Sequence, residues 1–327
     1  MLTSSFARFA GIALIATALT GAAQAADYTF KLGHLANEEN VWHRAALKFA
    51  EEVATLSDGR IEVQVFPNEQ LGKEIDLING IQLGTVDMTI TGESLQNWAP
   101  KAALLAIPYA LRDLGHLDAV AGGPIGEEIE AQIIEKTQLR PIAYFARGPR
   151  NLTSNRPITA PAELDGLRLR VPNVPLFVSV WETLGARPTP MAFSEVFTAL
   201  QSGTIDAQEN PLSLIKSASF HEVQSHVNLT EHVRSWIYVV IGENQFNALP
   251  EDLQAAVLEA GRRMQDHERA LFLAEEQQLA EDLQELGMTF VEVDKQAFIE
   301  AAKPAVLEAL SEELQALYEQ ILATGAE

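Results

Sequence analysis

The residues that most clearly suggest binding chemistry are five arginines gathered within one short stretch of the chain. They occupy positions Arg147, Arg150, Arg156, Arg168 and Arg170, and the same stretch has only two acidic residues. The whole chain, in contrast, has 23 basic and 45 acidic side chains and a formal net charge of −22. Arginine presents a planar fork of donors that fits a carboxylate in two parallel bonds, and it stays ionised when partly buried. We therefore expect a carboxylate receptor here.

The segment GLRLRVPN reads as a strand whose two faces differ. Alternate residues of a strand share a face, so Leu167, Leu169 and Val171 point one way and Arg168 and Arg170 the other. The competing interpretation is that both arginines are solvated surface residues. The pattern alone leaves these alternatives open.

Signatures of catalysis and of metal binding are missing. The sequence has no G-x-S-x-G, G-x-G-x-x-G, Walker A or H-E-x-x-H motif. Its seven histidines form no i,i+4 pair, and it has no cysteine. We therefore predict no catalytic residues, no metal site and no cofactor. The acidity also argues against nucleic acid and anionic lipid as partners, and is typical of a soluble protein.

The N-terminus predicts export. MLTSSFARFAGIALIATALTGAAQAAD combines one arginine, an apolar run too short to cross a bilayer and an Ala-Gln-Ala cleavage site. We expect residues 1–25 to be a cleavable signal peptide and the product to be periplasmic, without direct membrane insertion. A retained membrane anchor is the alternative.

The next part of the chain alternates strands and helices. Apolar periodicity and turn residues predict strands near 28–33, 61–67 and 86–91, with helices near 42–56 and 73–83. This order favours a parallel or mixed sheet with helices on its faces.

Two heptapeptides suggest two similar lobes. IQLGTVD (81–87) and LQSGTID (200–206) both place a glycine where a helix ends and then enter a strand. Gly84 and Gly203 suit the left-handed conformation that closes a helix. Two-lobed α/β proteins commonly hold a small ligand in the crevice between the lobes.

The C-terminal third is rich in helix formers. Residues 250–286 would form a helix about 55 Å long if it is continuous, and a helix of this length could brace both lobes. A coiled coil is the alternative, but the apolar residues do not keep to strict heptad positions. A strand near 288–293 follows. Asp294 can cap a last helical region that runs to about residue 321.

Residues 150–211 resemble the DctP-type substrate-binding proteins of TRAP (tripartite ATP-independent periplasmic) transporters. The similarity lies in the L-x-G-L-x-x-R-V-P, LGA-x-PTPM and LQ-x-G-x-[VI]-D-x-QEN elements, which occur in order. VQVFPNEQLG (63–72) and AIPYALRD (106–113) extend the resemblance over nearly the whole mature chain.

The resemblance implies an α/β fold with two-lobe periplasmic-binding-protein architecture, a mixed sheet in each lobe, crossing strands and one long bracing helix. We expect lobe 1 to comprise 26–147 plus about 236–275, and lobe 2 to comprise 148–235 plus about 276–327. Hinges are expected near 146–150 and 232–238. The implied partners are a small-molecule carboxylate ligand and the small and large integral membrane subunits of a TRAP permease.

The same resemblance implies that Arg170 binds the ligand carboxylate in a two-pronged pair. It also implies that Arg150 and Asn210 contact the ligand and that Phe193 lies near it. From the first lobe, His34, Asn37 and Glu93 are candidate contacts. A cleft glutamate would repel a second carboxylate and accept hydrogen bonds from hydroxyls. This favours a sugar acid such as a hexuronate.

Several alternatives to this interpretation stay open. The ligand could be a C4-dicarboxylate or a 2-keto acid. The protein could serve an ABC importer, or it could be an exported hydrolase.

Overall fold

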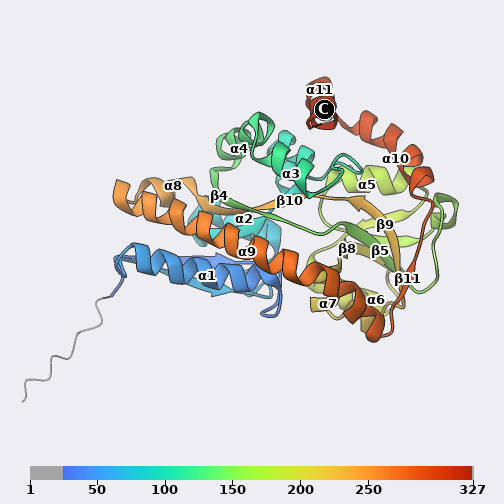
Figure 1. Ribbon diagram of the computed structural model, residues 1–327, viewed down its shortest axis with the longest axis horizontal. Helices are drawn as coiled ribbons and strands as arrows, with labels where there is room; N and C mark the ends of the chain where they lie inside the picture. The colour runs from blue at the N-terminus through green and yellow to red at the C-terminus, as the bar shows by residue number, and fades with distance from the viewer. Residues whose placement is uncertain (1–24, 326–327) are drawn as a thin grey trace, which may run out of the picture.

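The computed structural model describes residues 25–325 and contains two β-sheets with helices packed around them (Figure 1). The first 24 residues of the predicted signal peptide lie outside the described residues. The strands are β1 (Tyr28–Gly33), β2 (Ile61–Phe66), β3 (Met88–Thr91), β4 (Leu139–Ala146), β5 (Arg150–Ser154), β6 (Arg168–Val171), β7 (Arg187–Pro190), β8 (Ala207–Pro211), β9 (His226–Val233), β10 (Trp236–Gly242) and β11 (Thr289–Val291).

The α-helices are α1 (Val41–Leu56), α2 (Glu74–Leu83), α3 (Leu114–Ala121), α4 (Pro124–Thr137), α5 (Pro175–Thr183), α6 (Val196–Gln201), α7 (Leu212–Ser217), α8 (Glu243–Asn247), α9 (Glu251–Glu285), α10 (Lys295–Ala309) and α11 (Glu312–Ala323). Short 3-10 helices occur between them, including η1 (Glu93–Asn97) and η2 (Pro100–Ala106).

Both sheets are mixed. The first has the order β2-β1-β3-β10-β4, in which β1 runs parallel to β2 and β3 while β10 is antiparallel to its two neighbours. The second has the order β11-β9-β5-β8-β6-β7, in which β5 is antiparallel to β8 and β9. The chain passes from the first sheet to the second between β4 and β5, and returns between β9 and β10.

The two heptapeptides take up equivalent places in the two sheets. Gly84 and Gly203 both have the left-handed backbone conformation, with φ of 74° and 68°. Asp87 accepts a hydrogen bond from the main-chain nitrogen of Lys31 at 2.8 Å, and Asp206 accepts one from that of Arg168 at 3.1 Å. Each aspartate thus ties the start of its strand to the parallel neighbour, so the internal similarity is structural.

The long predicted helix forms as α9, a continuous helix of 35 residues that packs on α1 and β4 and, further along, on α7 (Figure 1). Two acids in its first turn, Glu251 and Asp252, favour its N-terminus. Gly261 permits the close approach to β4, because a Cβ there would lie 2.6 Å from the main-chain oxygen of Ile142.

The last predicted helical region divides into α10 and α11. Asp294 caps α10 as expected, accepting from the main-chain nitrogen of Ala297 at 3.0 Å. α10 packs on α5, whereas α11 packs on η2, and the ring of His116 in α3 lies 2.8 Å from the main-chain oxygen of Ile321. The C-terminal segment therefore touches elements associated with both sheets, and the exact lobe boundaries stay a prediction.

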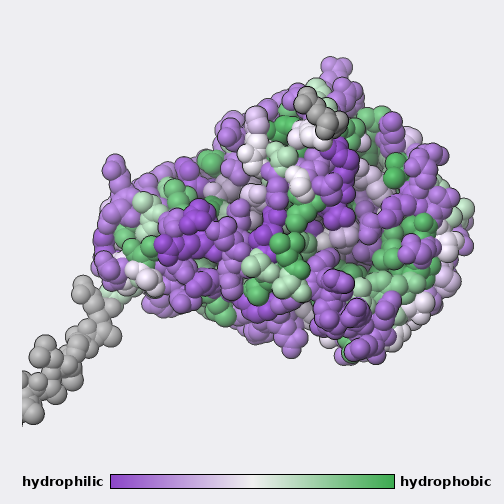
Figure 2. All heavy atoms as spheres, in the orientation of Figure 1, coloured by the Kyte–Doolittle hydropathy of each residue, from purple (hydrophilic) through white to green (hydrophobic). Residues whose placement is uncertain are grey.

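The predicted fold class, a two-lobed α/β protein with a mixed sheet in each lobe, is confirmed. On the face that carries α1 and α9 the surface is mainly hydrophilic, with apolar residues in small areas (Figure 2). Within residues 25–325 no helix combines the length and the apolar character that a membrane span requires.

Candidate ligand-binding site

A cavity of about 110 Å³ lies between the two sheets. A single buried water needs about 10–15 Å³ of such free space, so the cavity has room for a small organic molecule. Its wall combines residues from the α2 and η1 region with residues from the second sheet. The polar residues that matter most are Glu74, Thr91, Glu93, Ser94, Arg147, Arg150, Arg170 and Asn210. Trp42, Phe193 and Ile237 contribute apolar surface.

Arg170 lies on β6, with 3% of its surface exposed. Nε and Nη2 both donate to the main-chain oxygen of Met191, at 3.0 and 2.7 Å. The guanidinium carbon lies 5.9 Å from the centre of the Phe193 ring. Burial lowers the pKa of Arg170 to about 10, which still leaves it charged at neutral pH. Among the ion pairs formed by residues 25–325, none includes this side chain.

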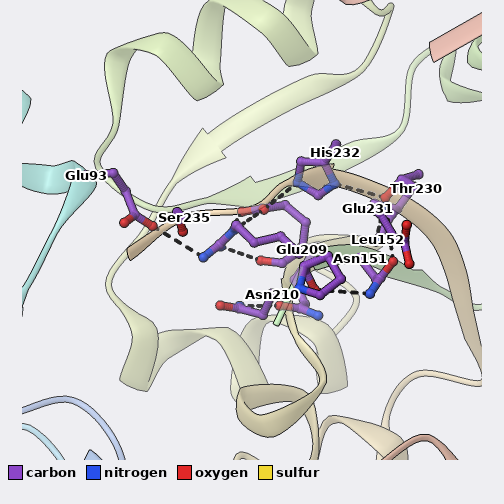
Figure 3. A network of polar contacts seen from close by, with 12 residues as sticks. Glu93, Asn151, Leu152, Glu209, Asn210, Thr230, Glu231, His232 and Ser235 are labelled. Atoms are coloured by element: carbon purple, nitrogen blue, oxygen red, sulfur yellow. Dashed lines mark hydrogen bonds and ion pairs between the residues drawn. The ribbon is translucent and has the colours of Figure 1, made fainter. Parts of the chain in front are cut away.

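Arg150, at the start of β5, is fixed by Glu209 of the neighbouring strand β8. Nε and Nη2 of Arg150 donate to the two carboxylate oxygens at 2.5 and 2.7 Å. The ring of His232 lies 2.8 Å from Glu209 and 2.9 Å from the hydroxyl of Thr230 (Figure 3). Burial alone would raise the pKa of Glu209, but Arg150 and His232 outweigh it and hold that pKa at about 2.

Arg147 and Glu93 form a second buried pair. Nη2 of Arg147 donates to Glu93 at 2.6 Å, and Nε donates to the hydroxyl of Ser235 at 3.2 Å. Arg150 adds a longer contact to the other oxygen of Glu93, at 3.4 Å. Burial raises the pKa of Glu93, but the two guanidinium groups more than offset this and lower it overall. Glu93 is therefore an ionised, compensated group.

Glu74 opens α2 and accepts hydrogen bonds from two hydroxyls. Thr91 donates to one carboxylate oxygen at 2.6 Å and Ser94 donates to the other at 3.0 Å. Burial raises the pKa of Glu74, and the nearby charge of Glu93 adds to this effect. Within residues 25–325, Glu74 forms no ion pair.

The charges at the site follow from these contacts. Glu209 compensates Arg150, and Glu93 compensates Arg147. Arg170 remains as a buried cation whose protein partner is a neutral carbonyl. Nη1 and the second hydrogen of Nη2 are then available on the end of its fork. Such an arrangement can bind one carboxylate in a two-pronged, charge-assisted pair.

Five of the seven predicted site residues line this cavity: Arg170, Arg150, Asn210, Phe193 and Glu93. The other two lie elsewhere. His34 is fully buried, and its Nε2 lies 3.1 Å from Nδ1 of His43. Asn37 donates to the main-chain oxygen of Ser217 at 2.7 Å and lines a separate groove.

The remaining arginines of the cluster have different surroundings. Arg168 is exposed and pairs with Asp206, although it shares a strand face with Arg170. Arg156 is exposed and donates to the main-chain oxygen of Glu163. Arg147 does line the cavity. Sequence reasoning left its role unassigned, because nothing in RGPR indicates that Glu93 will lie beside it.

Glu74 and the Glu209–His232 pair were not among the predicted residues. Glu209 stands directly before Asn210 in the QENP element, which was the available signal for it. Glu74 follows the LGK turn and lies in the first turn of the helix predicted near 73–83, where an acid is ordinarily explained by the helix dipole.

Contacts between the two sides close the mouth of the cavity. Lys73, directly before α2, pairs with Glu195 at 2.7 Å. Asn97 donates to the main-chain oxygen of Asn173 at 2.8 Å, and the main-chain nitrogen of Leu176 donates to Gln96 at 3.2 Å. The structure thus has the lobes in contact across the cleft.

The fold and this site define a solute receptor, and comparison with known proteins agrees. The chain belongs to the DctP family, the bacterial extracellular solute-binding proteins of family 7, which matches residues 32–313. Proteins of this family are binding receptors of TRAP transporters, so the predicted family and the prediction that the chain is not an enzyme are confirmed.

The most informative relative is a solute-binding protein of Roseobacter denitrificans. It is 65% identical over 315 residues, which cover 95% of this chain and 96% of the relative. Its crystal structure, that of a TRAP periplasmic solute-binding protein with bound L-galactonate, matches with a TM-score of 0.90 over 91% of this chain and 99% of that one.

Two more distant TRAP periplasmic binding proteins show how ligands vary. One from Xanthobacter autotrophicus, with bound β-D-galacturonate, has 28% identity and a TM-score of 0.87, and the match covers 90% of this chain and 99% of that one. One from Sulfurospirillum deleyianum, with bound succinate, has 27% identity and a TM-score of 0.86, with 91% and 99% covered.

Proposed function

We propose that this protein captures a sugar monocarboxylate in the cavity between its lobes and delivers it to a TRAP permease. The observation that carries the proposal is Arg170, a buried guanidinium that faces the cavity without a protein carboxylate. A single uncompensated cation matches a ligand with a single carboxylate. The L-galactonate bound by the Roseobacter protein, at 65% identity, is such a ligand.

In this proposal Arg170 binds the carboxylate through the end of its fork. Asn210 and Arg150, which line the same wall, lie within reach of the ligand's carboxyl end, and Phe193 covers it. Glu209 and His232 hold Arg150 in place. His34 and Asn37 do not line the cavity, so we assign them no contact with the ligand.

Delivery requires export and a membrane partner. We propose that residues 1–25 are removed as a signal peptide and that the mature receptor works in the periplasm. Ligand binding favours the closed lobes through differential affinity, which shifts the population toward the form that the permease subunits recognise. The β4–β5 and β9–β10 connections, two of the places where the chain passes between the sheets, would act as the hinges.

A C4-dicarboxylate is the second candidate ligand, because the Sulfurospirillum protein binds succinate. The two candidates are separated by thermal unfolding of the mature chain against L-galactonate, D-galacturonate, D-glucuronate, succinate, malate and 2-keto acids. A ligand that binds only the folded state stabilises it by about 2.7 kcal/mol at 100 times its dissociation constant. We expect a shift with the sugar acids. A shift with succinate or malate alone would refute the proposal.

A further inference from the structure

We infer that Glu276 and Gly148 form a proton-linked contact at the hinge, so that the lobes close around a ligand more readily when the Glu276 carboxyl is protonated. Glu276 is then a positioning residue, which acts on the ligand only through the hinge. The inference rests on the proposed function, since it takes the β4–β5 and β9–β10 connections as the hinges of a receptor that closes on its ligand.

Glu276 lies on α9 and Gly148 lies in the β4–β5 connection, and the carboxyl of the first packs against the main chain of the second. A Cβ built on Gly148 would lie 1.9 Å from Oε1 of Glu276 and 2.8 Å from Oε2. The absence of a side chain at Gly148 therefore leaves the space that the carboxyl occupies. Gly148 does not have the left-handed backbone conformation, so its backbone could accept an alanine.

The surroundings of Glu276 favour its protonated form. The side chain is partly buried at this contact, and burial raises its pKa to about 7 from an ordinary value of 4.5. Within residues 25–325 the carboxyl forms no hydrogen bond or ion pair that would hold it ionised. Arg234, in the β9–β10 connection, is the charged group that acts on it, and its positive charge lowers the pKa without cancelling the effect of burial.

The other basic and titratable side chains of the elements packed here, which are α1, β4, α7 and the two connections, have partners of their own. These are His43 with His34, Arg44 with Glu275, Lys48 with Glu51 and Glu52, Arg140 with Glu243, Tyr144 with Asp118, Arg147 with Glu93, Arg150 and His232 with Glu209, and Lys216 with Asp282. The titration of Glu276 therefore depends mainly on how far the hinge covers it.

The hinge position makes this cover depend on closure. Helix α9 packs on β4 of the first sheet and, further along, on α7, which directly follows β8 of the second sheet (Figure 1). Rotation of the lobes changes the main-chain torsions of the β4–β5 connection directly beside the carboxyl. The structure has the lobes in contact, and the carboxyl is covered. When the lobes open, the connection turns away and water reaches the carboxyl, which returns to its ordinary pKa.

The pKa difference gives the direction of the pH effect. Glu276 keeps its proton up to about pH 7 in the closed lobes and only up to about pH 4.5 in the open lobes, so closure takes up a proton between these values. Ligand affinity should be high at acid pH and should fall as pH rises through about 7. With these two pKa values the affinity at pH 6 is about tenfold that at pH 8.

Titration calorimetry with L-galactonate at pH 6 and pH 8 tests the inference, because a ligand carboxylate stays ionised at both values. Measured at pH 6.5 in buffers of different ionisation enthalpy, wild type should take up about 0.7 of a proton per ligand. Glu276→Gln is neutral throughout, so it should lose this uptake and bind more tightly than wild type at pH 8. Glu281→Gln removes an exposed carboxylate from the same helix and should behave as wild type.

A second variant separates the contact from the carboxyl. Gly148→Ala keeps Glu276 but fills the space that its carboxyl occupies, so the carboxyl moves toward water and the proton uptake should disappear as in Glu276→Gln. Wild-type protein that binds galactonate equally at pH 6 and pH 8, or either variant with the full wild-type proton uptake, would overturn the inference and leave the proposed function intact. A wild-type protein that binds no sugar acid would refute the proposed function, and the inference with it.

Discussion

Two nitrogens of Arg170 converge on one acceptor, the main-chain oxygen of Met191, at 3.0 and 2.7 Å. Met191 directly follows β7, which pairs in parallel with the strand that carries Arg170. The sheet itself therefore orients the guanidinium, and it does so through a carbonyl, which fixes the fork without cancelling its charge. This combination of a fixed direction and a charge without a protein carboxylate suits the residue to the carboxylate-binding role that we propose for it.

The Arg150–Glu209 pair, in contrast, is a structural pair with Glu209 fully buried. Glu209→Gln would leave the guanidinium without its counter-charge. Breaking a buried pair in this way costs about 3–5 kcal/mol, so we expect urea unfolding to show a loss of that size. The double variant Arg150→Met/Glu209→Leu should be less destabilised, because no isolated charge remains. An unfolding free energy of Glu209→Gln equal to that of wild type would contradict this account.

Glu209 also gives a prediction for acid conditions. Its pKa is about 2 in the folded protein, against an ordinary value of 4.5. The folded state therefore binds fewer protons than the unfolded state between these values. The stability due to this group is complete above about pH 4.5 and is lost as pH falls toward 2. Urea unfolding of wild type and Glu209→Gln should converge as the pH falls through this window. A difference that stays constant would rule out Glu209 as the cause.

Glu268 on α9 should act in the opposite direction. It is 1% exposed, its two oxygens have no hydrogen-bond partner within residues 25–325, and burial raises its pKa to about 8. Between its ordinary value of 4.5 and about 8 the folded state holds one more proton, so its contribution to stability falls as pH rises.

The test is the pH dependence of the unfolding free energy. Glu268→Gln should gain stability relative to wild type as the pH is raised from about 5 to about 9. Glu285→Gln, an exposed change on the same helix, serves as the control and should follow wild type. If the Glu268 variant also follows wild type throughout, the carboxyl does not titrate as described.

The Lys73–Glu195 pair links the two sides of the cavity mouth at 2.7 Å, with both side chains about half exposed. Exposed pairs contribute little to stability, so we expect Lys73→Ala to release ligand a few fold faster, with little change in thermal stability. Stopped-flow measurement of the dissociation rate checks this. Added salt should reduce the difference by screening the pair. A variant with wild-type kinetics at low salt would show that this contact does not hold the lobes closed.

Much of the fold could be predicted from local pattern. The helix-forming run that became α9, the glycines that end α2 and α6, and the face of β6 that carries Arg170 all follow from periodicity and turn chemistry. The partners of the buried charges could not be predicted in this way. Glu93 and Arg147 are 54 residues apart in the chain and meet only after both sheets have formed. Local pattern therefore identified Glu93 but could not show that its charge would be compensated by Arg147, or that Glu74 would line the same cavity.

The most direct test of the central claim is titration calorimetry of the mature protein and of Arg170→Lys with L-galactonate. Lysine keeps the positive charge but lacks the planar pair of donors of a guanidinium. The variant therefore loses a charge-assisted hydrogen bond to the carboxylate, which contributes about 1.5–3 kcal/mol to the free energy of binding. We predict saturable binding of one ligand by the wild-type protein and an affinity about 10–100 times weaker in the variant. Wild-type affinity in Arg170→Lys would contradict the account, because the carboxylate would then be held elsewhere.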